Sequence, residues 1–260
     1  MEKINADKIK NELKTDFIGK NIILYDKTDS TNTQAKLNHN EADGTVFIAE
    51  SQTSGRGSRG REWISPDGTG IWMSILLKPE IPIEKVSQIT LIAGLAVKKA
   101  IGDDVMIKWP NDVVAQKKKV CGILTETSIV SGKIQGVVCG IGINVNDTEF
   151  PDEIAQRATS LCILKGEKLS RNTLIVSVLD EFEKLYKIFI RDGLGTIIEE
   201  YRNACITLSK NIKVVYDNKE VTGVATNITE IGSLIIKTDD GIELEVNSGE
   251  VSIRGMYGYV

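Results

Sequence analysis

The sequence predicts an α+β fold, in which a mixed or antiparallel sheet carries helices and a small all-β unit follows. Three strand-like stretches at residues 113–116, 120–130 and 134–145 are joined by links short enough for hairpins, which predicts an antiparallel meander. The helices and strands before the meander do not alternate as regular βαβ units, so a doubly wound parallel sheet is disfavoured. The end of the chain contains only short strands and turns. We therefore expect two domains, 1–209 and 210–260.

The first part of the chain supplies helices and strands in irregular order. Val86, Ile89, Ala93 and Val97 recur at helical spacing, which predicts a helix with one buried face. Ser30 is a suitable N-cap for a shorter helix. The elements expected here are helices within 1–15, at about 31–38 and at about 86–100, and strands at 21–25, 45–50, 70–78 and 104–108.

Two helices are expected between the meander and the C-terminal unit. Ser170 is a suitable N-cap for the first, whose apolar residues Ile175, Leu179 and Phe182 lie at helical spacing and which ends near Gly193. The second runs from about 196 to 204. Hairpin links are expected at 117–119 and 131–133, and turns of the C-terminal unit at 217–218, 240–241 and 248–249.

The composition indicates a soluble globular protein rather than a nucleic-acid binder. The 260 residues are 41% hydrophobic and 26% charged, and the net charge is −4. Nucleic-acid binders usually carry a basic face, which disfavours DNA as a partner. No apolar run approaches the ~18 residues of a membrane span. The first 20 residues are charged and lack the apolar stretch of a signal peptide. We therefore expect a cytoplasmic protein with no membrane partner.

Cysteine and histidine supply no recognisable catalytic or zinc pattern. Cys121, Cys139, Cys162 and Cys205 match neither metal-ligand nor redox spacings, so we expect reduced and mostly buried thiols. His39 is the only histidine, and it lies in a polar loop-like stretch with no companion for a nucleophilic mechanism. The chemistry is therefore expected to come from arginine, lysine and backbone groups.

The most informative segment is 55–61, which reads Gly-Arg-Gly-Ser-Arg-Gly-Arg. Glycines let backbone N–H groups approach a ligand closely, and arginines supply fixed cations for phosphate or carboxylate. The glycine spacing matches a dinucleotide fingerprint, but Pro66 and Gly68 follow where that motif needs a helix. It also matches a P-loop, but Arg61 and Glu62 stand where Lys and Ser/Thr are required.

A disordered arginine–glycine tract that contacts RNA is a third interpretation of this segment. Such tracts are usually long and lie in low-complexity regions. This one has seven residues and lies between two predicted strands. We therefore expect a loop, ordered already or able to become ordered, that wraps an anionic ligand on a sheet.

Four further motifs accompany this loop in a fixed order. They are Ser30-Thr31-Asn32, Lys108-Trp109-Pro110-Asn111-Asp112, Lys119-Val120-Cys121-Gly122-Ile123-Leu124 and Gly140-Ile141-Gly142-Ile143-Asn144. Gln52 stands three residues ahead of Gly55. From about residue 20 to residue 145, this arrangement resembles the biotin protein ligase (biotin–acetyl-CoA-carboxylase ligase) family. The C-terminal unit is similar to that family's small SH3-like β-barrel domain. The resemblance implies a catalytic fold related to class II aminoacyl-tRNA synthetases and lipoate ligases.

The resemblance implies a two-step activity. Biotin and MgATP give biotinyl-5′-AMP and pyrophosphate, and the biotinyl group then passes to one lysine of a biotin carboxyl carrier protein. No protein nucleophile is needed for the first step, so catalysis rests on positioning and on neutralising phosphate charge. Arginines, lysines and glycine N–H groups suit that task.

The biotin site is carried over from the resemblance onto matching positions. Hydroxyls and amides suit the neutral ureido ring, which both donates and accepts hydrogen bonds. Helix capping is the structural alternative for Ser30 and Asn32, and a solvated loop charge is the alternative for any one arginine. The expected biotin residues are Ser30, Thr31, Asn32, Gln52, Gly55, Arg56, Gly57, Ser58, Lys119, Gly122 and Gly140.

The nucleotide site is carried over in the same way. The expected nucleotide residues are Arg59, Arg61, Trp63, Lys108, Asn111, Asp112, Gly142 and Asn144. Lys119 and Arg56 are the expected catalytic residues, while Lys117 and Lys118 are expected to form a solvated turn. Asp112 is the expected Mg²⁺ partner, directly or through water. A strand-ending turn is the alternative for the segment around Asp112, and loop anchoring is the alternative for Trp63.

The chain departs from the family pattern in two places. Ser58 stands where many members carry arginine, and we hypothesise that biotinyl-AMP leaks faster as a result. Only about 20 residues precede the first expected strand, whereas some members carry a winged helix-turn-helix there. This predicts a monofunctional ligase without operator binding, with a truncated bifunctional protein as the alternative. A homodimer is common in the family, and nothing in the sequence fixes it.

Two alternative functions remain open from the sequence. One is lipoate or octanoyl transfer on a related fold, which the 108–112 and 55–61 motifs disfavour. The other is a non-catalytic biotin or nucleotide sensor, which a substituted residue at position 119 would indicate; lysine is present there.

Overall fold

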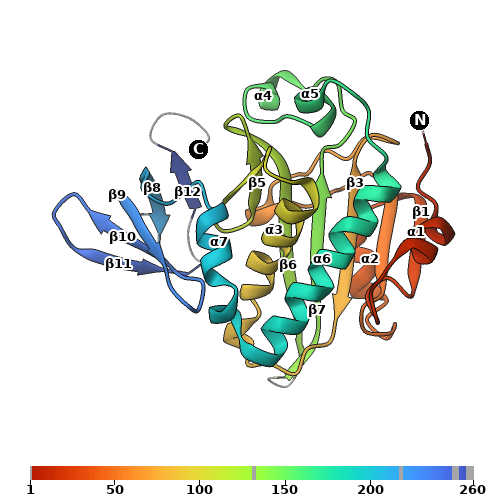
Figure 1. The fold of residues 1–260 in the computed structure, drawn as a ribbon, viewed down its shortest axis with the longest axis horizontal. Helices are drawn as coiled ribbons and strands as arrows, with labels where there is room; N and C mark the ends of the chain where they lie inside the picture. Colours follow the sequence, from red (N-terminus) through yellow and green to blue (C-terminus); the bar gives the residue numbers. More distant parts are fainter. Residues whose placement is uncertain (1, 131–132, 217–218, 248–251, 256–260) are drawn as a thin grey trace.

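The computed structural model describes residues 2–130, 133–216, 219–247 and 252–255. Within these ranges the chain forms a seven-stranded sheet of order β1-β2-β3-β7-β6-β5-β4 and a five-stranded sheet of order β11-β10-β9-β8-β12 (Figure 1). The strands are β1 Ile22–Thr28, β2 Val46–Gln52, β3 Ile71–Leu77, β4 Met106–Lys108, β5 Asp112–Ala115, β6 Lys118–Val130, β7 Lys133–Ile143, β8 Asn211–Tyr216, β9 Lys219–Ile228, β10 Leu234–Thr238, β11 Glu243–Val246 and β12 Ser252–Gly255.

The helices connect the strands without a repeating βαβ order. They are α1 Ala6–Glu12, α2 Thr31–Leu37, α3 Gln88–Ile101, α4 Asp152–Ala155, α5 Leu161–Lys165, α6 Arg171–Asp192 and α7 Ile198–Ala204, with short 3₁₀ turns at Ser58–Gly60, Ile83–Lys85 and Leu194–Thr196. Ser170 caps α6 by accepting a hydrogen bond from the backbone N–H of Thr173, and α6 ends at Gly193, where φ is 81°. The expected α+β class is confirmed.

The predicted meander is confirmed, since β5, β6 and β7 are antiparallel neighbours. The sheet is mixed because β1 pairs with β2 in parallel. The short helices α4 and α5 were not predicted, because residues 152–165 carry no sustained helical periodicity. The turn at Asp240-Gly241 is present. Of the link expected at 131–133, residues 131–132 lie outside the described residues, as do the turns expected at 217–218 and 248–249.

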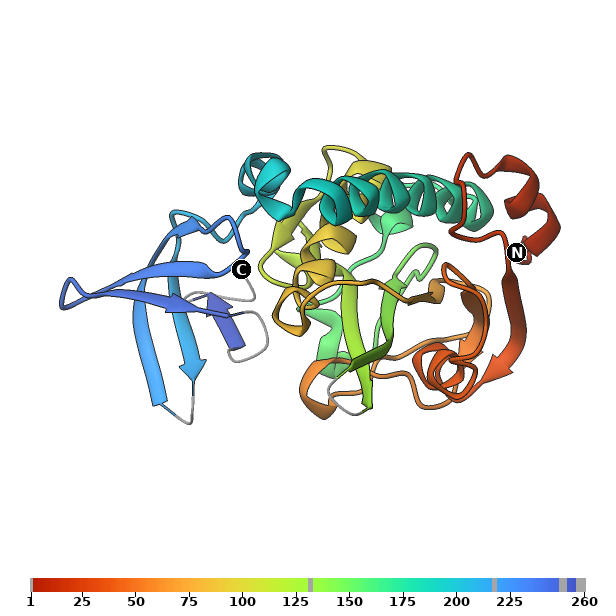
Figure 2. The same ribbon diagram turned by 90° about the horizontal axis from the view of Figure 1, so that it is seen from below.

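The two faces of the main sheet are covered differently. Figure 2 shows the teal helix α6 above the sheet and the orange-red segment that contains α2 below it. The α6 face holds the large core, to which α3 contributes Ile89, Ile92 and Ala96 and α6 contributes Phe182. The α2 face has a much smaller apolar cluster, formed by Ala35, Phe47, Leu76 and Val138. The sheet therefore stabilises the fold on one face and leaves the other for polar side chains.

The C-terminal sheet lies beside the main sheet (Figure 1), and hydrogen bonds join it to the rest of the chain. The indole N–H of the buried Trp109 donates to the Gly232 carbonyl at 3.0 Å, and Nε of Arg202 donates to the Ile228 carbonyl at 2.7 Å. An SH3-like barrel was expected, but β11 and β12 remain the two edges of the sheet among the described strands. The described pairing is therefore an open sheet rather than a closed barrel. None of the helices in the described ranges has the length and apolar composition needed to cross a membrane.

Candidate functional site

Part of the α2 face of the main sheet carries no side chains because its residues are glycines. Gly122 pairs with Gly142 across β6 and β7, and Leu124 pairs with Gly140. Alternate residues of a strand point to the same face, so Gly122, Leu124 and Gly140 share the α2 side. A Cβ atom at Gly140 would lie 2.1 Å from Oδ1 of Asn32, and one at Gly142 would lie 2.6 Å from Nε1 of Trp63. These close approaches require glycine and create a shallow floor.

The start of α2 places small polar side chains at one end of this floor. The Thr31 backbone N–H and hydroxyl lie 2.8 and 3.2 Å from Oε1 of Gln52. The Ser74 hydroxyl lies 2.7 Å from Oγ1 of Thr31 and 2.6 Å from Oδ1 of Asn32. Ser30 is the N-cap residue of α2, but its side chain forms no capping hydrogen bond. Its hydroxyl is therefore not committed to the helix.

The glycine–arginine segment is an ordered hairpin above the floor. The Trp63 N–H donates to the Gly55 carbonyl at 2.8 Å, and the Gly57 N–H donates to the Arg61 carbonyl at 2.7 Å. A Cβ atom at Gly55 would lie 2.3 Å from the Trp63 carbonyl oxygen, so the hairpin needs glycine there. Arg59 forms the tip with a φ of 60°. No α-helix follows among these described residues, which agrees with the rejection of the dinucleotide fingerprint.

A β-bulge turns Lys119 toward the floor. On β5 the partner of Val113 is Cys121, whereas the partner of Val114 is Lys119, so Val120 is the extra residue. Val120 and Cys121 both lie in the large core on the α6 side. Lys119 consequently faces the α2 side, where its Nζ would be 2.9 Å from a Cβ at Gly122. Bulges often re-aim side chains beside active sites in this way.

The ammonium group of Lys119 has two neighbours in this structure. Nζ lies 2.5 Å from Oδ1 of Asp112 and 5.0 Å from the centre of the Trp63 ring. The indole Nε1 of Trp63 is buried, and no hydrogen-bond acceptor reaches it among the described residues. A buried N–H without an acceptor is costly, so Trp63 is a candidate to move or to gain a partner when a ligand binds.

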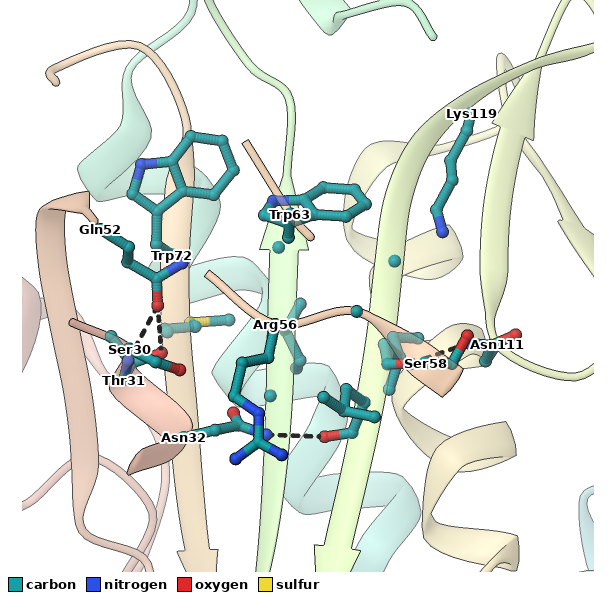
Figure 3. A pocket seen from close by; sticks show the side chains of 18 residues that line it. Ser30, Thr31, Asn32, Gln52, Arg56, Ser58, Trp63, Trp72, Asn111 and Lys119 are labelled. Carbon is teal, nitrogen blue, oxygen red and sulfur yellow. Dashed lines mark hydrogen bonds between the residues drawn. The ribbon is translucent and has the colours of Figure 1, made fainter. Parts of the chain in front are cut away.

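These features surround a pocket, shown in Figure 3. Figure 3 shows Arg56 pointing toward Asn32, and Lys119 at the other end of the pocket near Trp63. The residues lining it are Ser30, Thr31, Asn32, Gln52, Arg56, Gly57, Ser58, Trp63, Trp72, Met73, Asn111, Lys119, Gly122, Ile123, Leu124, Gly140, Ile141 and Gly142.

Some residues expected at the site do not line the pocket. Asp112 and Lys108 are register partners on the neighbouring strands β5 and β4, and neither lines the pocket. The Asn144 side chain donates to the Thr159 carbonyl at 3.1 Å. Arg61 donates to the carbonyl and hydroxyl of Ser58, at 3.1 and 2.9 Å. Gly55 lies at the base of the hairpin, and Arg59 lies at its tip. The ligand roles expected for these six residues stay predictions.

Other lining residues were not expected from the sequence. Trp72, Met73, Ile123, Leu124 and Ile141 come from the three central strands. Strand alternation gives each strand two faces, but it does not say which face carries the pocket. Only the positions of α2 and of the hairpin on the sheet identify that face.

Two family models match the chain. Residues 24–144 match the Biotin/lipoate A/B protein ligase family, and residues 207–254 match the Biotin protein ligase C terminal domain. The first match spans the pocket, the hairpin and the central strands, and the second covers most of the C-terminal sheet.

Relatives and solved structures of the same kind cover nearly the whole chain. The Bifunctional ligase/repressor BirA of Bacillus subtilis is 36% identical over 96% of this chain and 79% of its own length. The Biotin--[acetyl-CoA-carboxylase] ligase of Paracoccus denitrificans is 35% identical over 88% of this chain and 99% of its own. A structure titled as the biotin protein ligase from Aquifex aeolicus in complex with biotin and ATP is 34% identical, with a TM-score of 0.82 over 91% of this chain and 99% of that chain.

Proposed function

This chain belongs to the biotin protein ligase family, and from that premise we propose that the pocket described above binds biotin and ATP side by side and joins them. The protein is a biotin–[acetyl-CoA-carboxylase] ligase, with biotin and ATP as substrates. In the first step a biotin carboxylate oxygen attacks the α-phosphorus of ATP, and the bond to pyrophosphate breaks. In the second step a carrier lysine amine attacks the acyl carbon of biotinyl-5′-AMP, and AMP leaves.

The observation that carries this assignment is the polarity of the pocket from end to end. Thr31, Asn32 and Gln52 form a neutral end of hydroxyls and amides, and Lys119 supplies a cation at the other end. A ureido ring needs the first environment, and a carboxylate beside phosphates needs the second. Residues 55–63 pass over both ends, so one hairpin contacts both substrates.

Positioning and charge neutralisation are the proposed sources of catalysis. The Lys119 ammonium would approach the carboxylate and α-phosphate, where negative charge accumulates in the transition state. Arg56 lies at the neutral end in this structure, 3.3 Å from a carboxylate oxygen of Glu126. Its proposed role over the carboxylate requires the guanidinium to leave Glu126 as the hairpin closes. Asn111, Trp63 and Gly142 would border the nucleotide.

Mg²⁺ would enter with ATP rather than occupy a protein cage. Among the described residues, no cluster of three His, Cys, Asp or Glu side chains is arranged to hold a metal ion. Protein-bound Mg²⁺ commonly uses one or two carboxylates together with substrate phosphates and water. Asp112 is the proposed carboxylate, because it lies 2.5 Å from Nζ of the pocket-lining Lys119 and therefore stands beside the pocket.

The partner and location proposed for the enzyme follow from the same chemistry. The acceptor would be a lysine of a biotin carboxyl carrier protein. All four cysteines are free and buried, which fits a reducing compartment such as the cytoplasm. We assign the catalytic unit to residues 1–209 and the C-terminal unit to 210–260, in line with the two sheets.

Lipoate transfer is the second candidate, since the matched family model includes lipoate ligases. A dithiolane ring offers no N–H or carbonyl group to a polar pocket. The cluster of Thr31, Asn32, Gln52 and Ser74 would then be buried against an apolar ring, which costs free energy. This cluster favours biotin.

Labelling of a carrier protein tests the whole proposal. Purified enzyme, biotin, MgATP and a biotin carboxyl carrier domain should give one added biotinyl group per carrier, measured by mass spectrometry. The carrier variant with arginine in place of the acceptor lysine should stay unmodified. A wild-type enzyme that leaves the intact carrier unlabelled would contradict the proposal.

Gly140→Ala is expected to raise the KM for biotin by about tenfold or more, because the new methyl group collides with the Asn32 amide and distorts this end of the pocket. The Asn32 side chain cannot easily yield, since Ser74 and the Leu124 carbonyl hold it at 2.6 and 3.2 Å. Steady-state pyrophosphate release gives the KM.

Gly136→Ala on the same strand is the matched control for that substitution. A Cβ at Gly136 would lie 3.3 Å from the end of the Leu76 side chain and 3.8 Å from the Leu77 carbonyl oxygen, an ordinary van der Waals contact. Its KM for biotin should stay within about twofold of wild type. Equal KM values for the Gly140 variant and wild type would exclude this packing role.

Ser58→Arg is expected to slow biotinyl-AMP dissociation by about 10- to 100-fold, since one charge-assisted hydrogen bond contributes about 1.5–3 kcal/mol. Ser58 lines the pocket, and its hydroxyl is bonded to Arg61 in this structure. Release of preformed adenylate into a trap is the measurement. Ser58→Met, which adds length without charge, should not slow release, and equal rates for Ser58→Arg and wild type would remove the hypothesis.

A further inference from the structure

Glu126 contacts Asn32 and Arg56 at the neutral end of the pocket without lining it, and it belongs to none of the motifs found in the sequence. It follows Gly122 and Leu124 at alternate positions of β6, so its side chain is on the α2 side of the sheet. Its carboxylate is largely buried, with 16% of the side chain exposed. A buried carboxylate in a pocket for a neutral ring requires an explanation, because desolvation of a charge is unfavourable.

The carboxylate is surrounded by three donor residues, two from α2 and one from the hairpin. Oε2 accepts a hydrogen bond from Nδ2 of Asn32 at 2.9 Å. Oε1 lies 2.5 Å from Nζ of Lys36 and 3.3 Å from a guanidinium nitrogen of Arg56. Burial favours the neutral acid, but the hydrogen bonds from Lys36 and Asn32 and the positive charges outweigh it, so the pKa of Glu126 lies below its usual value. The group therefore stays ionised and only accepts hydrogen bonds.

An acceptor-only neighbour determines which way the Asn32 amide faces. The amide has two N–H donors and one oxygen. Nδ2 is within hydrogen-bond distance of Glu126 and of the Leu124 carbonyl, at 2.9 and 3.2 Å. Both donors are thereby used, and Oδ1 faces Ser74 at 2.6 Å. Asn32 can then offer the pocket only the remaining lone pair of Oδ1, which suits a ligand N–H.

We propose that Glu126 is a positioning residue that fixes the Asn32 amide with its oxygen toward the pocket, so that this oxygen accepts a hydrogen bond from a ureido N–H of biotin. This inference rests on the proposed function and adds to it a reason why the pocket would select ligands with an N–H donor. Lys36, joined by Arg56 until the hairpin closes, maintains the charge of Glu126, and Glu126 acts on the ligand through Asn32. The arrangement rejects rings that lack an N–H donor, because the buried oxygen would then be left partly unsatisfied.

Glu126→Gln is a sharp test because it keeps the size of the side chain. The one oxygen of glutamine would pair with Lys36 and Arg56, which turns its NH₂ group toward Nδ2 of Asn32. Two donors would then face each other, and the Asn32 amide would reverse or lose its partner. We expect the Kd for biotin, measured by isothermal titration, to rise about tenfold or more, while the KM for ATP stays within about twofold.

A double-mutant cycle with Asn32→Ala separates positioning from a general structural effect. If Glu126 acts through Asn32, Glu126→Gln should change the biotin Kd by less than about twofold in the Asn32→Ala background. The same loss in both backgrounds would overturn the proposal, and so would wild-type affinity in the single variant. Glu245→Gln, an exposed change on β11, removes the same charge as a control and should bind biotin normally.

The outcomes also separate this inference from the proposed function. If wild-type enzyme fails to bind biotin or to exchange pyrophosphate, the proposed function is wrong. If wild type binds biotin and Glu126→Gln binds it equally well with an unchanged melting temperature, only the positioning role is wrong. If Glu126→Gln unfolds, the Lys36→Met variant provides the second test. It removes one cation from Glu126 by changing a partly exposed side chain of α2, and it should raise the biotin Kd without changing the KM for ATP.

Discussion

Lys119→Ala is expected to slow biotin-dependent ATP–pyrophosphate exchange by about 100- to 1,000-fold, the usual effect of removing one preorganised group that stabilises transition-state charge. The bulge at Val120 aims the Lys119 ammonium across the glycine floor, beside Trp63 and Asp112. Its loss leaves the approaching carboxylate and phosphates less neutralised. Arg56→Ala is also expected to slow the exchange strongly, since it removes the hairpin cation that lines the pocket.

Lys118→Ala is the matched control for the lysine at position 119. Its Nζ donates to the Ala155 carbonyl at 3.0 Å, and it does not line the pocket. Exchange by the Lys118 variant should stay near the wild-type rate. Circular dichroism must show a native-like spectrum for Lys119→Ala, so that the loss reflects chemistry. A folded Lys119→Ala enzyme with more than about a tenth of wild-type exchange would contradict the role given to this side chain.

Arg171→Met is expected to lower the free energy of unfolding by about 3–5 kcal/mol, because it leaves the buried Glu50 carboxylate without its partner. The Arg171 guanidinium lies 2.7 Å from Oε2 of Glu50, and the two side chains are 2% and 5% exposed. Arg171 also donates to the carbonyls of Glu2 and Gly70, and Glu50 accepts from the Ile4 N–H. One pair thus joins α6, β2, the start of β3 and the N-terminal segment. Urea unfolding gives the free energy.

Arg191→Met, at the exposed end of α6, is the control for this substitution. Arg191 pairs with the adjacent Asp192, and 75% of its side chain is exposed. Exposed pairs contribute little, so its unfolding free energy should match wild type. A second variant, Glu50→Gln, should also destabilise the protein, because it leaves the Arg171 charge unbalanced. If both buried variants unfold at the same urea concentration as wild type, the stabilising role given to the Arg171–Glu50 pair is wrong.

Local patterns in the sequence were sufficient for most of the fold. The spacing of Ile175, Leu179 and Phe182 predicted α6, and Ser170 and Gly193 marked its ends, because capping and periodicity are properties of neighbouring residues. The hairpins of the meander follow from short links between apolar runs. The parallel pairing of β1 and β2 was not predicted, since α2 lies between them and strand order is set by distant contacts.

The same holds for the candidate site: its local motifs were recognised in the sequence, and its contacts between distant residues were not. Glycine-rich motifs indicated the hairpin and the floor, and the pocket brings Thr31, Gln52, Lys119 and Gly140 together. Glu126 was missed because its partners lie 90 and 94 residues away in sequence, and a single acidic residue in a strand carries no motif. The buried pair of Glu50 and Arg171 was missed for the same reason.

Asn144 has a structural contact that its motif did not predict. The Gly140–Asn144 motif predicts a place beside the nucleotide, which stays a prediction, and the structure shows its amide donating to the Thr159 carbonyl. Thr159 N–H in turn donates to the Lys119 carbonyl at 2.9 Å, and Lys119 N–H donates to the Arg157 carbonyl at 2.7 Å. Asn144 and Lys119 are thus linked through the 146–160 segment. No local sequence pattern predicted the path of that segment.

Biotin-dependent exchange of labelled pyrophosphate into ATP, without any carrier protein, tests the central claim most directly. The enzyme, MgATP and pyrophosphate are combined with biotin, lipoate or octanoate in parallel. If the pocket joins biotin to AMP without a covalent enzyme intermediate, exchange should be rapid with biotin. Exchange with lipoate or octanoate should be slow. Absence of exchange with biotin, or equal exchange with octanoate, would contradict the account.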